Sequence, residues 1–179
     1  MRSRIVLFVL IAGLAAVLGF VTFTPVQALW LVQHLGYWVI LLGSALFAYL
    51  LVRSLGQDRQ ALSDWRAQLS DWRWPALTIA ACSLFLHIHE EHGFKIVMDE
   101  VVLQGTAMKM HLLREVGTPV RGYDFAGNYL MLSSFIDKRP LFFPFLLSSL
   151  HDLTGFRVAN GLLLNALLTP VFLLMGYLI

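Results

Sequence analysis

Long apolar runs alternate with short polar connections along this chain of 179 residues. From Ile5 to Val52 the sequence contains no Asp, Glu, Lys or Arg, and Thr24-Pro25 interrupts the run. Because a helix needs roughly 20 apolar residues to cross a bilayer, this stretch predicts two spanning helices. Three further apolar runs follow at 74–89, 140–150 and 158–179.

These runs predict an all-α integral membrane protein with four to five transmembrane helices. The run at 140–150 is short for a span. Whether it crosses the membrane or only enters it is therefore open, and so is the side of the membrane on which the C-terminus lies. Between the runs, residues 87–140 form a long polar stretch. Apolar positions at helical spacing over 95–116 predict a helix lying along the membrane surface, and glycines over 117–127 predict turns.

Basic residues indicate the orientation of the chain. The connector 53–73 contains four Arg and three Asp, and Arg2 and Arg4 precede the first span. Excess Arg favours the cytoplasmic side, which places the stretch 87–140 outside the cytoplasmic (inner) membrane.

A repeat of Leu-Ser-Asp-Trp-Arg within the connector puts Trp65 and Trp72 on one helical face, which predicts an amphipathic helix at the inner headgroups.

Composition narrows the classes of function. Only 13% of the residues are charged, against about 25% in soluble domains. The net charge of +2 and the absence of a basic stripe with interleaved aromatics argue against a nucleic-acid partner. Because Cys82 is the only cysteine, an internal disulfide is excluded.

Residues 5–23 also resemble a secretory signal with a cleavage site at 26–28.

The apolar C-terminal run has no polar flank, which favours the N-terminal part of a longer protein over a small complete subunit.

Asp99-Glu100 is the first candidate functional pair. A carboxylate near lipid is costly unless it is solvated or paired, and neighbouring residues on a helix point about 100° apart. One interpretation makes Asp99 a general base that deprotonates an acceptor hydroxyl. The other is a solvated acidic pair at a helix start, which the helix dipole favours.

Lys138-Arg139-Pro140 is the second candidate. Pro140 suits the first position of a helix, and open N–H groups at a helix start attract anions. Arg139 can bind a phosphate as a fork and Lys138 as a point charge, although both side chains can instead reach lipid headgroups.

His87, His89 and His92 form a third polar cluster together with Glu90 and Glu91. Their spacing is compatible with a divalent metal site. The alternative interpretation is a polar exit from the third span. The sequence therefore predicts no required metal or cofactor, with this cluster as the candidate if an ion binds.

Four features occur in order here and resemble the N-terminal part of GT-C-fold membrane glycosyltransferases. They are an apolar span, Met98-Asp-Glu100 opening a surface helix, the run Lys138-Arg-Pro-Leu-Phe-Phe-Pro144, and Leu153-Thr-Gly-Phe-Arg157 before another span. The most similar branch is the protein mannosyltransferase and aminoarabinose transferase-like group (glycosyltransferase family 39-like). The resemblance covers about residues 74–179, so 1–52 holds two extra spans. Arg139 stands where this family commonly has a proline.

The resemblance implies transfer of a sugar from a polyprenyl-phosphate-linked donor to an acceptor at the outer face of the membrane. Asp99 would be the catalytic carboxylate that activates the acceptor, and Glu100 would support the site. Lys138, with Arg139, would hold the lipid phosphate. The implied partners are membrane lipid and the donor.

Two other classes of protein fit the same pattern. A small non-catalytic membrane subunit would use these helices to pack within a larger complex and would co-purify with membrane protein partners. A fragment of a lipid-linked sugar transporter would share the phosphate site but would tolerate loss of Asp99.

Overall fold

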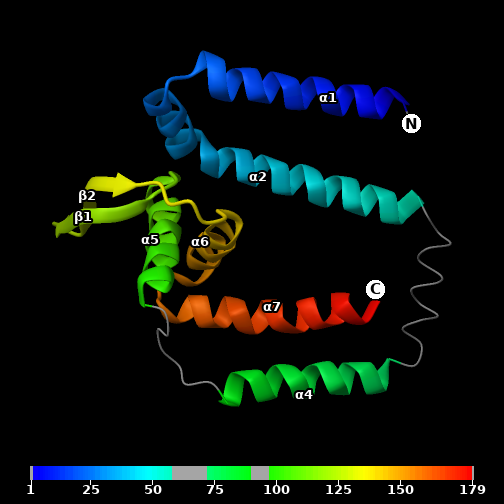
Figure 1. The fold of residues 1–179 in the computed structure, drawn as a ribbon. Coiled ribbons are helices and arrows are strands. Elements are labelled where there is room, and N and C mark those ends of the chain that lie inside the picture. Colours follow the sequence, from blue (N-terminus) through cyan, green and yellow to red (C-terminus); the bar gives the residue numbers. More distant parts are fainter. Residues whose placement is uncertain (1, 58–71, 90–96, 179) are drawn as a thin grey trace.

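The structure is a computed structural model that describes residues 2–57, 72–89 and 97–178. Its elements are α1 (Arg2–Val17), a π-helical turn η1 (Leu18–Thr22), α2 (Pro25–Gln57), α4 (Arg73–His89), α5 (Val97–Leu113), β1 (Thr118–Phe125), β2 (Asn128–Phe135), α6 (Phe142–Thr154) and α7 (Ala159–Leu178). Helices α5 and α6 and the hairpin β1–β2 gather at one end of the long helices α2, α4 and α7 (Figure 1).

A capping box separates the first two long helices. The side chain of Gln27 accepts hydrogen bonds from the backbone N–H and the hydroxyl of Thr24, both at 3.0 Å. Pro25 occupies the first position of α2, where its missing N–H costs nothing. This Thr-Pro-Val-Gln sequence therefore ends one apolar run and begins the next.

Three helices of the described part are long and apolar enough to cross a membrane: Ile5–Thr22, Pro25–Ser54 and Ala159–Tyr177. The apolar helix α4 is shorter. These helices support a mainly helical membrane protein, while the count of four to five spans and the sides of the loops remain predictions.

The expectation of an all-α chain is wrong between Thr118 and Phe135, which form an antiparallel hairpin. Its turn residues Ala126 and Gly127 have φ of +53° and +79°, as in the two-residue turns that join twisted strands. The Asp124 carboxylate accepts the Gly127 N–H at 3.0 Å. Ala-Gly lacks the Asn-Gly or Asp-Gly signature of such turns, so the glycines indicated turns without indicating strands.

Helix α6 begins at Phe142, two residues later than the proline predicted. Lys138 and Arg139 consequently lie in the loop before the helix and not in its first turn. The 13 residues of α6 span about 20 Å at 1.5 Å per residue, short of the roughly 30 Å hydrocarbon core. Its buried face includes Phe145, Leu147 and His151, so α6 packs within the protein.

The buried core lies where α5, α6 and α7 meet. Ala107, Leu147 and Leu164 form one cluster across these helices. A second cluster joins Met110, Val116 and Phe145 to Tyr37 of α2. Helix α2 is therefore packed against the region that carries the candidate residues.

Gly36→Ala is expected to lower the thermal stability of the detergent-solubilised protein. A Cβ at Gly36 would lie 2.8 Å from Cγ2 of the buried Val116, whose N–H also donates to the Gln33 carbonyl at 2.7 Å. Such overpacking typically costs about 1–3 kcal/mol. Gly43→Ala, in the same helix with open space around it, is the matched control and should be neutral or stabilising. Equal melting temperatures for the two variants would contradict this packing.

Most of the predicted amphipathic connector lies outside the described residues, including Trp65. Helix α2 extends through Gln57, so residues 53–57 continue this helix and do not belong to a separate connector helix. Trp72 is described at a turn and is exposed.

Candidate functional site

Arg139 brings the two predicted candidate groups into direct contact. Its Nη2 donates to Oδ1 of Asp99 at the start of α5, and its Nη1 donates to Oδ2 of Asp137. The backbone N–H of Arg139 also donates to Asp137, at 3.3 Å. The sequence predicted that the acidic pair and the basic pair lie on the same side of the membrane, and the structure places Asp99 and Arg139 side by side.

The charges of this group reinforce one another. The hydrogen bond to Asp137 raises the pKa of Arg139 most strongly, and that to Asp99 adds to it against the effect of burial. Burial raises the pKa of Asp137, but hydrogen bonds from Arg139 and two backbone N–H groups outweigh it, so this pKa is lowered. Asp137 and Arg139 therefore stabilise each other in their charged forms.

Lys138 stands apart from this arrangement. It is exposed, and it forms no ion pair with any residue that the structure describes. Its ammonium is a cation next to Arg139 in sequence that is available to an external anion.

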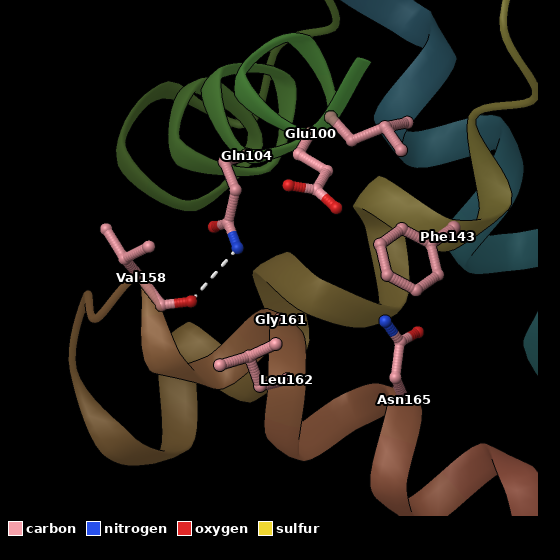
Figure 2. A pocket seen from close by; sticks show the side chains of 8 residues that line it. Glu100, Gln104, Phe143, Val158, Gly161, Leu162 and Asn165 are labelled. Carbon is pink, nitrogen blue, oxygen red and sulfur yellow. Dashed lines mark hydrogen bonds between the residues drawn. The ribbon is translucent and has the colours of Figure 1, made fainter. Parts of the chain in front are cut away.

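Glu100 points in a different direction from Asp99, as neighbouring residues on a helix do. It lines a cavity of about 140 Å³ between α5, α6 and the start of α7, with Phe143 and Asn165 among the other walls. The carboxylate of Glu100 points into the space in front of Phe143 and Asn165 (Figure 2). The cavity is mainly apolar with three polar side chains, the usual composition of a small-molecule site.

One wall of this cavity requires a residue without a side chain at Gly161. A Cβ there would lie 2.3 Å from Nε2 of Gln104, which donates to the Val158 carbonyl at 3.1 Å. Oε1 of Gln104 is buried and has no hydrogen-bond partner in the described part of the chain. The cavity thus contains a fixed amide whose acceptor is unsatisfied.

A second polar network joins α5 to α6 and α2. Asp152 accepts from Arg114 at 2.6 Å and contacts Nδ1 of His111 at 2.5 Å. Arg114 also donates to the Tyr37 hydroxyl at 3.2 Å. The sequence did not single out Asp152 or Arg114, because their pairing depends on how distant segments of the chain pack.

His151 is fully buried near this network. Its Nδ1 faces the Asn160 amide at 2.8 Å, and that amide also donates to Thr154 and to the Gly155 carbonyl. Burial, and next the neighbouring His111, lower the pKa of His151. Asn160 therefore joins α7 to α6 by hydrogen bonds, which are a common link between apolar helices.

Acidification is expected to destabilise the contact of α5 with α6. Burial raises the pKa of Asp152, but hydrogen bonds from Arg114 and His111 outweigh it, so the folded-state pKa is lowered. Its stabilising effect is present above about pH 4, the unfolded value, and is lost as the pH falls through the folded value. Thermal melts between pH 6 and pH 3 should show a shallower loss for Asp152→Asn than for wild type. Parallel curves would contradict this assignment.

A third network holds α2 against α5. The buried Lys109 contacts Glu115 at 3.1 Å and donates to Ser134 at 2.9 Å. Gln33 of α2 donates to the same carboxylate at 3.2 Å, and His34 lies 3.5 Å from it. A lysine within an otherwise apolar helix face was the signal in the sequence for this network.

The predicted histidine cluster is only partly described. His87 contacts the Ser83 carbonyl at 2.7 Å through Nδ1, whereas His92 and the side chain of His89 lie outside the described residues. Elsewhere in the described part no three His, Cys, Asp or Glu side chains come together as a metal site. The prediction about an ion at this cluster stays untested.

Comparison with known proteins adds no identification. No protein-family model matches the chain, and no curated protein and no solved structure matches it significantly.

Proposed function

We propose that this chain carries the site of a GT-C-like glycosyltransferase. It transfers a sugar from a polyprenyl-phosphate-linked donor to an acceptor at the outer face of the cytoplasmic membrane. The observation that supports this most is the contact of Asp99 with Arg139, across 40 residues of sequence. It joins a carboxylate suited to proton abstraction and a cation suited to phosphate at the end of a bundle of apolar helices.

The proposed reaction is displacement at the anomeric carbon of the sugar. The acceptor oxygen forms a bond to this carbon while the bond from the carbon to the phosphate oxygen breaks. The electron pair leaves with the lipid phosphate, and the acceptor proton moves to Asp99. Lys138 and Arg139 stabilise the negative charge that develops on the phosphate.

The cavity lined by Glu100, the residue after Asp99, provides the second support. Glu100, Gln104 and Asn165 present polar atoms in this mainly apolar space. Hydroxyl groups of a sugar or an acceptor match such acceptors and donors. Glu100 would thus orient a substrate, while Asp99 removes the proton.

Lys138→Gln is expected to reduce sugar transfer by about tenfold. This is less than the loss of about 10²–10³ for a donor in a closed site, because Lys138 is exposed. The assay follows release of polyprenyl phosphate from a polyprenyl-phosphate sugar by the native polypeptide in its own membrane. Arg121→Gln removes an exposed charge on β1 and should keep wild-type activity. No release by the wild-type protein with any such donor would contradict the proposed function.

A further inference from the structure

Arg139 occupies the carboxylate that the proposed reaction requires. Oδ1 of Asp99 accepts a hydrogen bond from Arg139, so the guanidinium stands where the hydroxyl of an acceptor would have to approach this oxygen. The cation proposed to hold phosphate is engaged by the same contact. Both groups must therefore part before either of them meets a substrate.

The two carboxylates hold Arg139 unequally. Asp137 receives both a side-chain N–H and the backbone N–H of Arg139, and its side chain is 16% exposed. Asp99 receives one N–H, comes from a different element, and is 48% exposed. Exposed ion pairs contribute little to stability, so the contact with Asp99 is the one that a competing anion displaces.

A phosphate is well suited to displace it. The guanidinium presents parallel N–H groups that match two phosphate oxygens, which makes a stronger contact than one hydrogen bond to a carboxylate. Lys138 lies next to Arg139 in sequence and has no competing partner in the described residues. An arriving phosphate thus finds one cation open and one that is held by a weak contact.

We infer that Arg139 exchanges Asp99 for the phosphate of an incoming polyprenyl phosphate, while Asp137 keeps the guanidinium in place. This inference rests on the proposed function and adds its regulation. Asp99 becomes available to the acceptor only after the donor phosphate has bound, so the donor binds first. Removal of the acceptor proton in the absence of a donor is thereby prevented.

The test measures binding of polyprenyl monophosphate, which carries no sugar, to the native polypeptide in lipid nanodiscs. Asp99→Asn should tighten binding by about two- to fivefold, the range for release of an exposed ion pair. Arg139→Gln should weaken binding by about tenfold or more. In the double variant the gain from Asp99→Asn should disappear, because no guanidinium remains to be released.

Unchanged affinity in Asp99→Asn would overturn the exchange. An equal increase in affinity from Asp99→Asn in the presence and in the absence of Arg139 would also overturn it, because that result reports only repulsion between the carboxylate and the phosphate. Arg121→Gln, which removes the same charge from β1, should bind like wild type. If Arg139→Gln does not fold, Arg139→Lys replaces it, keeping a charge without the planar fork.

Sugar transfer is assayed on the same samples, which separates the two proposals. If the two substitutions have non-additive effects on the affinity for polyprenyl phosphate but the wild-type protein transfers no sugar, the exchange stands and the transferase proposal is overturned. If the wild-type protein transfers sugar but the two effects on affinity are additive, only the exchange is overturned. Absence of polyprenyl phosphate binding in every variant would overturn both.

Discussion

Asp99→Asn is expected to abolish sugar transfer while membrane insertion and folding stay intact. A positioned general base contributes about 10²–10⁴-fold to a rate, so turnover at saturating donor should fall by that factor. The amide has nearly the shape of the carboxylate, and it offers Arg139 a weaker, neutral hydrogen bond in place of the ion pair. The variant therefore removes the proton acceptor with little change to the packing at the start of α5.

The matched control is Asp124→Asn at the turn of the hairpin. It removes a carboxylate from the same side of the structure, and the amide oxygen can still accept the Gly127 N–H that Asp124 binds. Release of polyprenyl phosphate should be normal in this control. Full activity of Asp99→Asn would exclude Asp99 from the mechanism. If Asp99→Asn still moves a lipid-linked sugar across the membrane of vesicles, and no sugar is transferred to an acceptor, the result would favour a transporter.

Features set by local sequence were predictable here. The absence of charge from Ile5 to Val52 predicted the first two spanning helices, and Thr24-Pro25 marked their boundary, where the capping box lies. The helical spacing of apolar residues after Lys95 predicted α5. In each of these cases the physical cause lies within a few residues of its effect.

Features set by packing between distant segments were not predictable. Asp137 was overlooked, although it is two residues from Arg139, because an acid beside a basic pair acquires meaning only through the bridge to Asp99. The docking of α2 on the segment between α5 and β1 depends on the close approach of Gly36 to Val116. The hairpin was missed because its Ala-Gly turn carries a weak signature, and two-stranded hairpins depend on their surroundings for stability.

The directions of Asp99 and Glu100 illustrate both cases. Their positions on adjacent faces of a helix follow from helix geometry alone. Which face meets the cation and which meets the cavity depends on the placement of α6 and α7, and the structure assigns Asp99 to Arg139 and Glu100 to the cavity. The separate roles proposed for the two carboxylates follow from that assignment.

Lys109→Met is expected to reduce the free energy of unfolding by about 2–3 kcal/mol, measured by denaturant titration in detergent. Breaking a fully buried ion pair costs about 3–5 kcal/mol, because one charge is left buried without a partner. The Glu115 side chain is 27% exposed, so water offsets part of this cost. The variant also removes the hydrogen bond to Ser134, which joins α5 to β2.

A double variant separates loss of the ion pair from loss of packing. Burial raises the pKa of Glu115, but hydrogen bonds from Gln33 and Lys109 outweigh it and keep the carboxylate ionised. Adding Glu115→Gln to Lys109→Met removes the orphaned charge, so the double variant should recover about half of the lost stability. Arg121→Met, on the exposed hairpin, should stay within about 0.5 kcal/mol of wild type. Strictly additive losses in the double variant would mean that Lys109 acts through packing alone. Recovery would mean that the loss comes from the unpaired charge of Glu115, the carboxylate that also binds Gln33 of α2.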